Sequence, residues 1–196
     1  MLKVGITGGI GSGKSTVCEV FHHLNIKIFN ADKAAKEIIN YDADVKSKLI
    51  SIFGKEIYEN SEKINKQKFA EIIFNNQKSL SIVNSIVHPV VMSKFDEFVY
   101  SHNMSKYIIK EAAILFESGS YKKLDKTITI SAPEKLRIQR VISRDNVDRQ
   151  VVIDRMKNQI SEKERINRAD FVIVNDEKTL LIPQILQIDN ILKNLK

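Results

Sequence analysis

The sequence predicts an α/β protein in which a parallel sheet of about five strands is flanked by helices. Two observations predict this fold class. Short apolar or β-branched runs alternate along the chain with longer segments whose apolar residues recur at helical spacing. A glycine-rich turn joins the first apolar run directly to the first helical segment. Strands that alternate with helices in this way form a parallel sheet with helices on both faces.

Five runs are expected to be strands, at residues 2–7, 26–29, 107–115, 127–130 and 171–174. Helical spacing covers residues 15–24, 32–53, 65–74, 79–87, 135–143, 150–160 and 180–195. His88-Pro89 is expected to break the helical pattern, with another helix running to about residue 100. One domain is expected, with its core at about residues 1–40, 101–133 and 169–196, a helical insertion without strands at about 41–100, and a helical lid at about 134–168.

The composition, with 43% hydrophobic and 28% charged residues among 196, is typical of a globular protein. The single cysteine, Cys18, excludes an internal disulfide bond and a multi-cysteine metal site. No apolar run approaches the roughly 18 residues that span a bilayer, and the N-terminus lacks the apolar stretch of a signal peptide. A cytoplasmic protein is therefore expected. The net charge of +7 indicates an anionic partner: nucleic acid, anionic lipid or a phosphorylated small molecule.

The turn after the first strand, Gly8-Gly9-Ile10-Gly11-Ser12-Gly13-Lys14-Ser15, fits the phosphate-binding P-loop pattern G-x-x-x-x-G-K-[ST]. Its glycines let backbone N–H groups close around phosphate oxygens, and the N-terminus of the next helix adds partial positive charge. Lys14 is expected to reach the β- and γ-phosphates of ATP, and the Ser15 hydroxyl to bind Mg²⁺. The residues expected to bind the nucleotide here are Gly9, Gly11, Ser12, Gly13, Lys14, Ser15 and Thr16.

A P-loop specifies a nucleoside triphosphate but not a reaction. A GTPase is disfavoured, because the sequence contains no D-x-x-G and no N-K-x-D. A motor or helicase would usually need a larger body. What remains suits a small kinase, which needs an acceptor-binding insertion, a base near the γ-phosphate and a mobile cationic lid that excludes water.

Two carboxylates are candidates for the chemistry. Asp32 follows the second predicted strand, where the carboxyl ends of parallel strands form a ligand crevice. It could accept the proton of the acceptor hydroxyl or orient that hydroxyl, or it could be a helix N-cap, and these roles can coexist. Glu111 lies inside an apolar predicted strand, where a carboxylate is costly unless it is paired or near a metal. It could serve the water shell of Mg²⁺ or form a buried ion pair with a lysine.

All seven arginines lie between Arg137 and Arg168, and residues 134–168 carry ten basic and six acidic residues, more than half of the excess charge. Arg140 and Arg144 are spaced i,i+4, so both project from one helix face. Such arginines, brought in by lid closure, stabilise the charge on a phosphoryl group in transfer. A solvated face with intrahelical ion pairs is the alternative for any single arginine. His88 is expected to hydrogen-bond substrate or backbone.

Taken together, the residues resemble the dephospho-coenzyme A kinase family over nearly the whole chain, from Val4 to Asn175. The matching elements are the P-loop with Thr7 before it, Asn30-Ala31-Asp32, Val87-His88-Pro89, Ile114-Leu115-Phe116-Glu117, Arg140-x-x-x-Arg144-Asp145 with Arg149 and Gln159 after it, and Ala169-Asp170-Phe171-Val172-Ile173-Val174-Asn175. Asn30 stands where the family often has Asp. Glu111 and Ala113 stand where Asp and Pro are common.

The resemblance implies transfer of the γ-phosphate of ATP, with Mg²⁺, to the 3′-hydroxyl of the ribose of dephospho-coenzyme A, the last step of coenzyme A synthesis. It implies that Asp32 is the catalytic base and that Asn175 lies near the nucleotide base. It implies that His88, Phe116 and Glu117 belong to the acceptor region. Lys14, Arg140 and Arg144 complete the expected catalytic set.

Other functions stay open at this point. A small-molecule kinase that acts on a nucleoside monophosphate or a sugar acid has compatible motif spacing. A nucleic-acid-binding P-loop ATPase is suggested by the charge of +7, but residues 137–168 contain no aromatic residue and the chain contains no tryptophan, so no nucleic-acid partner is expected. A nucleotide sensor without turnover is a third possibility. A monomer or small homo-oligomer is expected.

Overall fold

The computed structural model describes residues 1–59, 63–74 and 76–195, and it divides into two compact units. The first unit combines Met1–Phe29 with Ser101–Lys196. The second unit is Asn30–Tyr100, so it is inserted in the sequence of the first. None of the described helices is both long enough and apolar enough to cross a membrane.

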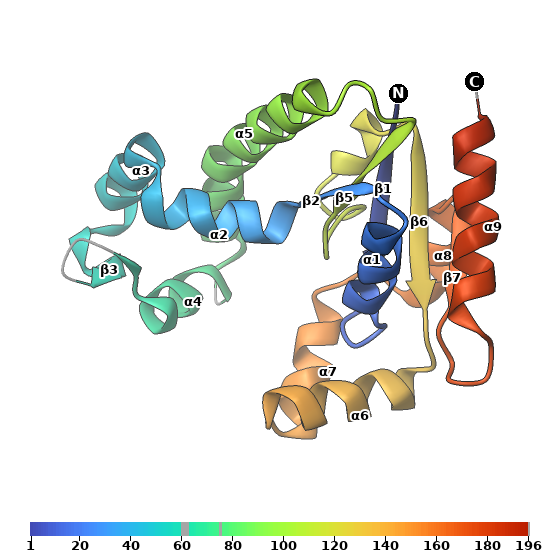
Figure 1. Cartoon of the computed structure of the whole chain (residues 1–196). Helices are drawn as coiled ribbons and strands as arrows, with labels where there is room; N and C mark the ends of the chain where they lie inside the picture. Colours follow the sequence, from blue (N-terminus) through green and yellow to red (C-terminus); the bar gives the residue numbers. More distant parts are fainter. Residues whose placement is uncertain (60–62, 75, 196) are drawn as a thin grey trace. The chain divides into compact units, whose positions relative to one another are not determined.

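The first unit contains a five-stranded sheet in the order β2-β5-β1-β6-β7 (Figure 1). These strands are β1 (Leu2–Gly8), β2 (Lys27–Asn30), β5 (Tyr107–Glu111), β6 (Lys126–Ser131) and β7 (Phe171–Val174). β1 pairs in parallel with both β5 and β6, and β6 pairs in parallel with β7. In this register Ile6 of β1 lies between Glu111 of β5 and Ile128 of β6. The predicted fold class, with its five strands, is confirmed.

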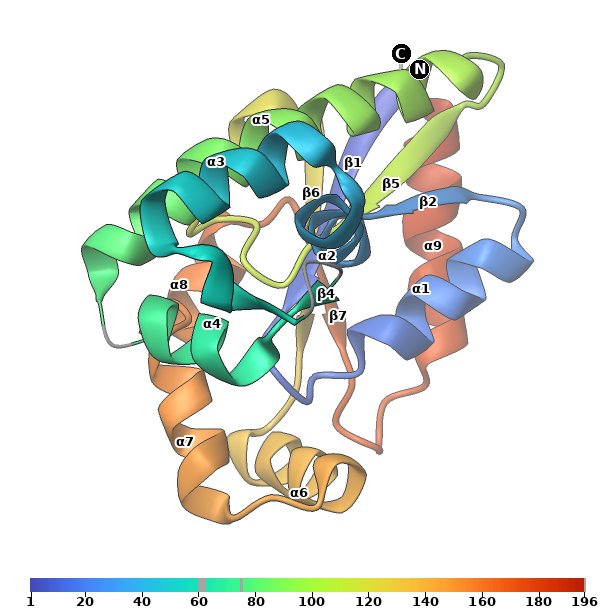
Figure 2. The same ribbon diagram turned by 90° about the vertical axis from the view of Figure 1, so that its left-hand side faces the viewer.

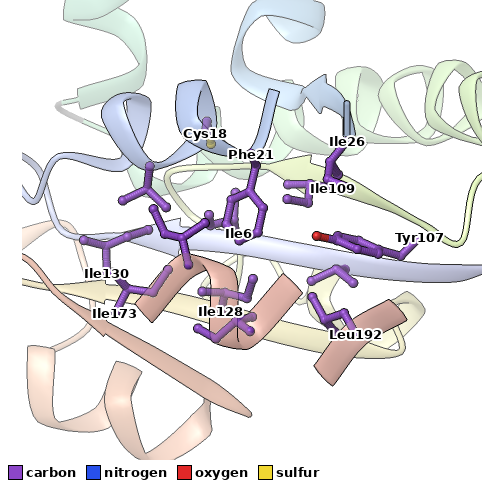
Figure 3. Packing of buried hydrophobic residues seen from close by; sticks show 14 residues of the cluster. Ile6, Cys18, Phe21, Ile26, Tyr107, Ile109, Ile128, Ile130, Ile173 and Leu192 are labelled. Atoms are coloured by element: carbon purple, nitrogen blue, oxygen red, sulfur yellow. The ribbon is translucent and has the colours of Figure 1, made fainter. Parts of the chain in front are cut away.

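Helices α1 (Lys14–His23) and α9 (Leu181–Asn194) contact each other and pack on one face of this sheet. Figure 3 shows Phe21 of α1 over Ile6, with Leu192 of α9 in the same apolar cluster. The cluster contains one buried hydroxyl, and that group is paired: Tyr107 donates a hydrogen bond of 2.7 Å to Asp189 of α9. Burial, and then Asp189, raises the pKa of Tyr107.

Helices α6 (Glu134–Asp145) and α7 (Arg149–Lys157) contact each other, and Figures 1 and 2 both show the pair beyond the end of β6. A small apolar cluster joins them, built on Ile138 and Val141 of α6 and Val152 of α7. Both helices were predicted. The next helix, α8 (Glu162–Arg168), was not predicted, because Ile166 is its single apolar residue and gives no periodic pattern.

The third predicted strand is shorter than expected. β5 ends at Glu111, and the following residues form turns and a 3₁₀ helix, η2 (Ser120–Lys123). Leu115 and Phe116 in this segment are nevertheless buried. An apolar run therefore predicted burial correctly but could not distinguish a strand from a packed turn.

The second unit contains helices α2 (Ala31–Tyr41), α3 (Ala43–Phe53), α4 (Lys66–Phe74) and α5 (Gln77–Ser101), with a 3₁₀ turn η1 (Lys55–Ile57). It also contains an antiparallel pair, β3 (Tyr58–Glu59) and β4 (Lys63–Ile64). The prediction that this region has no strand is therefore wrong. The strands were missed because two residues are too few to show a period of two. The pair is joined to α2 through the Tyr58 hydroxyl, which donates to the Ile39 carbonyl at 2.8 Å.

The predicted break at His88-Pro89 is also wrong, because α5 continues through Pro89. Proline removes one backbone N–H, which costs a helix one hydrogen bond. Four apolar residues at a spacing of four continue across that point, and all of them are buried: Val83, Val87, Val91 and Phe95. Burial of this continuous face outweighs the loss at Pro89, which is itself exposed.

Candidate active site

The P-loop occupies the turn between β1, which ends at Gly8, and α1, which begins at Lys14. Gly11 and Gly13 have φ values of 77° and 89°, a region that other residues adopt only with strain. No side chain caps α1, and its first turn has no acidic residue. The first amides of α1 and its positive dipole end are therefore suited to an anion. The buried Ser12 hydroxyl also lacks a hydrogen-bond partner within the described part of the chain.

Lys14 forms an ion pair with Glu111, the last residue of β5. The Lys14 and Glu111 side chains are only 15% and 8% exposed. One of the two roles considered for Glu111, a buried ion pair with a lysine, is thus observed. The pair holds the Lys14 ammonium group at the P-loop. Its charges also act on Cys18, whose pKa is raised to about 12, first by burial and then by Glu111, while Lys14 opposes the shift.

Ser15 and Thr16 lie in the first turn of α1, and both are exposed. The Ser15 hydroxyl has no hydrogen-bond partner among the described residues, so its oxygen is available to a ligand. The donor set fits a Mg²⁺–nucleotide complex, since it combines a hydroxyl, an unsatisfied helix N-terminus and a lysine held nearby. No group of three His, Cys, Asp or Glu residues suited to a metal occurs in residues 1–59, 63–74 and 76–195.

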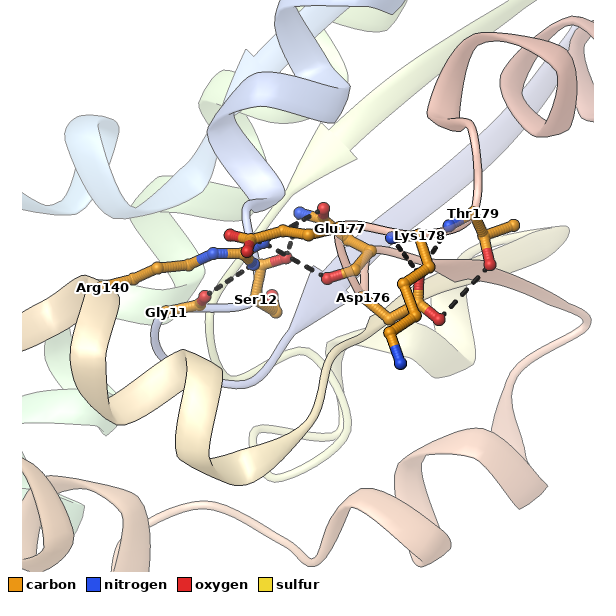
Figure 4. A network of polar contacts seen from close by, with 8 residues as sticks. Gly11, Ser12, Arg140, Asp176, Glu177, Lys178 and Thr179 are labelled. Carbon is orange, nitrogen blue, oxygen red and sulfur yellow. Dashed lines mark hydrogen bonds and ion pairs between the residues drawn. The ribbon is translucent and has the colours of Figure 1, made fainter.

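Arg140 reaches from α6 onto the P-loop (Figure 4). Its guanidinium donates to the Gly11 carbonyl at 3.4 Å and to the side-chain oxygen of Asn175 at 3.3 Å, and it forms an ion pair of 3.1 Å with Glu177. Asn175 in turn donates to the Ser12 carbonyl at 2.8 Å. The structure therefore brings together the P-loop, Arg140 and Asn175, three of the parts expected from the sequence. Glu177 was not predicted, and its positive φ of 66° has no signature in the sequence.

Two further arginines are buried against the P-loop. Arg137 is 5% exposed and Arg165 is 3% exposed. A Cβ atom added to Gly9 would collide with the Arg137 guanidinium and would lie 2.9 Å from Nη2 of Arg165. A solvated face was one reading of the arginine segment, and it is wrong for these two residues.

Gln159 ties the segment after α7 to the P-loop. Its Oε1 accepts a hydrogen bond of 2.9 Å from the Ile10 amide, and its Nε2 donates to the Ala113 carbonyl at 3.2 Å. Nearby, Glu117 accepts a hydrogen bond of 3.1 Å from the Ile160 amide. Phe116 is buried, with its ring 5.2 Å from that of Tyr121. The turns after β5 and the segment after α7 thus form one packed border to the P-loop.

Arg144 lies apart from these residues. Its side chain is 64% exposed and binds Asp145 through two hydrogen bonds, of 2.7 and 3.1 Å. Arg155 of α7 binds the same carboxylate at 3.1 Å. The hydrogen bond from Arg144 lowers the pKa of Asp145, and the same bond raises the pKa of Arg144.

Asp32 and His88 belong to the second unit. Asp32 lies in the first turn of α2, and the cap of that helix is Asn30, whose side chain accepts from the Lys33 amide at 2.8 Å. The N-cap role considered for Asp32 is therefore wrong. His88 lies inside α5, so it does not end a helix. Both side chains are partly buried.

Comparisons with known proteins agree with this geometry. A family model described as dephospho-CoA kinase matches residues 2–180. A dephospho-CoA kinase from Bacteroides fragilis is 35% identical over 187 residues, which cover 95% of this chain and 91% of the relative. The crystal structure of TT1252 from Thermus thermophilus has a TM-score of 0.85 and 26% identity, covering 100% of this chain and 98% of that one. A dephospho-CoA kinase structure from Campylobacter jejuni has a TM-score of 0.70 and 28% identity, covering 96% and 95%. This chain belongs to the dephospho-CoA kinase family.

Proposed function

We propose that this protein transfers the γ-phosphate of ATP to the 3′-hydroxyl of the ribose of dephospho-coenzyme A, giving coenzyme A and ADP. The observation that carries the proposal is a complete P-loop in a chain of this family. In it, Lys14 pairs with Glu111, and Arg140 donates a hydrogen bond to the Gly11 carbonyl. The transition state of phosphoryl transfer spreads negative charge over the phosphoryl oxygens. Catalysis then depends mainly on positioned cations and amides, which this site contains.

The P-loop amides and Lys14 bind the phosphates in this proposal, with the nucleotide contacts running from Gly9 to Thr16 and Asn175 beside the nucleotide base. Ser15 would hold Mg²⁺, and Glu111 would serve its water shell. The ion would supply positive charge against the phosphate oxygens. Glu111 already pairs with Lys14, so the proposal assigns one buried carboxylate to both the lysine and the metal's water shell.

Arg140 and Arg144 act as the cationic part of a lid formed by residues 134–168. Asp32 accepts or orients the proton of the acceptor hydroxyl. His88, Phe116 and Glu117 belong to the acceptor site, and residues 41–100 hold the acceptor. Asp32 and His88 belong to the second unit, and the P-loop, Arg140 and Arg144 belong to the first.

The deciding experiment measures ADP release with dephospho-coenzyme A, AMP, CMP and gluconate as acceptors. Release with dephospho-coenzyme A alone is the expected result. Release with AMP or CMP instead would assign a nucleoside monophosphate kinase, and ATP binding without release with any acceptor would assign a sensor. A mobility shift with single-stranded RNA that weakens with salt would support the nucleic-acid alternative.

The role of Asp32 is tested by Asp32→Asn, with Asp44→Asn as a matched control. Both residues are second in their helices, and Asp44 is exposed. We expect Asp32→Asn to keep ATP binding and to lose most turnover, by about 10²–10⁴-fold, the usual contribution of a positioned acid or base. Asp44→Asn should retain turnover. Near-normal turnover of the Asp32 variant would remove Asp32 as the base.

A further inference from the structure

The buried arginines Arg137 and Arg165 form a cluster of positive charge. Neither residue has a role in the function proposed above. They come from different helices, α6 and α8, and their guanidinium groups converge beside Gly9 at the start of the P-loop. Two buried cations repel each other: burial, and then Arg137, lowers the pKa of Arg165. A fold keeps such a pair only where anionic groups compensate it.

The protein compensates this charge incompletely. Glu162 lies 3.5 Å from Nη2 of Arg137, and its other oxygen accepts hydrogen bonds from Ser131 Oγ at 2.6 Å and the Ala132 amide at 3.0 Å. Arg165 donates to the neutral Ile160 carbonyl at 3.1 Å, and the charges of Glu117 and Glu162 oppose the effect of burial and of Arg137 on its pKa only in part. The buried Nε of Arg137 has no partner in the part of the chain that is described. A buried donor without an acceptor is rare in folded proteins and calls for a ligand or an ordered water.

A cavity of about 310 Å³ adjoins the pair. Arg137, Arg165 and Lys157 line it with the carboxylates of Glu134 and Glu162, and its other walls are polar or apolar: Ile153, Met156, Gln159, Ile160 and Ser161. Gln159 also binds the Ile10 amide, so the wall of the cavity is continuous with the P-loop. The cavity therefore combines apolar walls with three basic and two acidic side chains, and Gln159 connects it to the P-loop.

We propose that Arg137 and Arg165 bind a phosphate group of a substrate, and that this group is the γ-phosphate of ATP. Guanidinium groups suit phosphate because their parallel N–H donors match two of its oxygens. The site's position at Gly9, within the P-loop, favours the nucleotide over the acceptor as the source of the phosphate. The identity of the two substrates rests on the proposed function. The alternative source is the diphosphate of the acceptor.

The test compares Arg137→Gln and Arg165→Gln with Arg168→Gln. Arg168 lies on the same helix as Arg165 but is 43% exposed and pairs with Glu164, so it controls for loss of charge. Calorimetry measures the affinity for a non-hydrolysable ATP analogue, for ADP and for dephospho-coenzyme A. We expect each Gln variant at the buried pair to bind the ATP analogue about tenfold more weakly or worse, in line with the loss of a charge-assisted hydrogen bond, while ADP affinity changes little. Arg168→Gln should match the parent protein for all three.

Each other outcome has a defined meaning. Loss confined to dephospho-coenzyme A would overturn the γ-phosphate assignment and place the acceptor diphosphate at the pair. Equal losses for ATP analogue, ADP and acceptor, or no loss for any, would show that the pair only packs against the P-loop. If the Gln variants do not fold, Arg165→Lys keeps the charge but not the fork of donors. The same selective loss for the ATP analogue is then expected, and unchanged affinities would overturn the proposal.

Failure of this inference is separable from failure of the proposed function. The parent protein's ADP release with dephospho-coenzyme A tests the function without reference to the pair. Conversely, a selective loss of ATP-analogue affinity would support the phosphate site even if another acceptor were found.

Discussion

Two groups of arginines in residues 137–168, one at the P-loop end of the α6–α8 region and one at the corner between α6 and α7, differ in what their guanidinium groups contact. At the P-loop end, Arg137, Arg140 and Arg165 lie against Gly9 and Gly11. At the corner between α6 and α7, Arg144 and Arg155 share the Asp145 carboxylate, with side chains that are 64% and 45% exposed. The residue type is the same in both groups, and Arg137, Arg140 and Arg144 lie on the same helix. The difference teaches that the neighbouring element, rather than the arginine itself, determines whether such a group contacts the P-loop or solvent.

The energetic consequences differ in the same way. An exposed ion pair contributes little, because water screens it and two long side chains lose freedom in forming it. A buried cation contacts fixed dipoles at low dielectric, where its interactions are strong and its need for an anion is greatest. Substitution at the P-loop end should therefore lower catalysis more than substitution at the corner, where Arg144 is bound to Asp145.

The largest expected effect separates Arg140 from Arg144. Arg140→Gln should lower kcat/KM by about 10²-fold, the usual cost of losing one preorganised donor to a developing oxyanion. Arg144→Gln should lower it by about tenfold or less, because closure must first release Arg144 from Asp145. Steady-state kinetics with ATP varied will measure both. An equal or larger loss for Arg144 would break the comparison, because it would show that the corner closes onto the phosphates during turnover.

A methyl group at Gly9 should disturb the buried end alone. In Gly9→Ala, the added carbon would collide with Arg137, so we expect a loss of about 1–2 kcal/mol in the free energy of unfolding from overpacking. kcat/KM should fall about tenfold, equivalent to about 1.4 kcal/mol. The control is Gly119→Ala, where nothing lies within 4 Å and the positive φ of 70° alone costs about 1 kcal/mol. Equal activity of the two variants would show that the pair tolerates displacement.

Near the P-loop, Cys18 of α1 should make the free energy of unfolding depend on pH in the alkaline range. Burial raises the pKa of this thiol from 9.0 to about 12. Its stabilising effect is therefore complete below pH 9 and is lost as the pH rises toward 12. We expect the free energy of unfolding to fall by about 1 kcal/mol between pH 9 and pH 10 from this group, and Cys18→Ala to remove that part of the slope. Denaturant titrations at both pH values decide it, and identical slopes in the two proteins would exclude Cys18 as the cause.

The smallest effect is expected at the corner. The hydrogen bond from Arg144 lowers the pKa of Asp145, so this carboxylate stabilises the fold above its ordinary pKa of 3.8 and stops doing so as the pH falls below it. Asp145→Asn should lower the melting temperature slightly at neutral pH and low salt. The difference from the parent protein should vanish in high salt and in acid. A deficit that persists in high salt would mean that the corner is structurally more important than its exposure indicates.

The sheet was predictable because each of its strands is a short apolar or β-branched run next to a helical pattern. The P-loop was predictable because its glycines, Lys14 and Ser15 have fixed spacing. Features that lack periodicity were missed: the seven residues of α8, the two-residue strands β3 and β4, and the path of α5 through Pro89. In each case tertiary packing determines the backbone conformation, and the local sequence pattern does not indicate that packing.

The candidate site shows the same limit. Spacing correctly placed Arg137, Arg140 and Arg144 on one helix, but spacing describes only the helix on which residues lie. It does not say that α8 brings Arg165 to the same glycine, or that Glu162 of α8 accepts from the end of β6. Glu111 is the instructive exception. A carboxylate inside an apolar strand required a partner, and the partner is the P-loop lysine.

The last helix, α9, lies outside the region that the family model matches but inside the folding unit. The family match stops at residue 180, while α9 begins at Leu181 and supplies Ile185 and Leu192 to the core, with Asp189 on Tyr107. A protein shortened to the matched region would expose to water the part of the core that α9 covers, including Tyr107. The boundary of the folding unit therefore lies beyond the boundary of the family match, and α9 has to be kept in any shortened version of this protein.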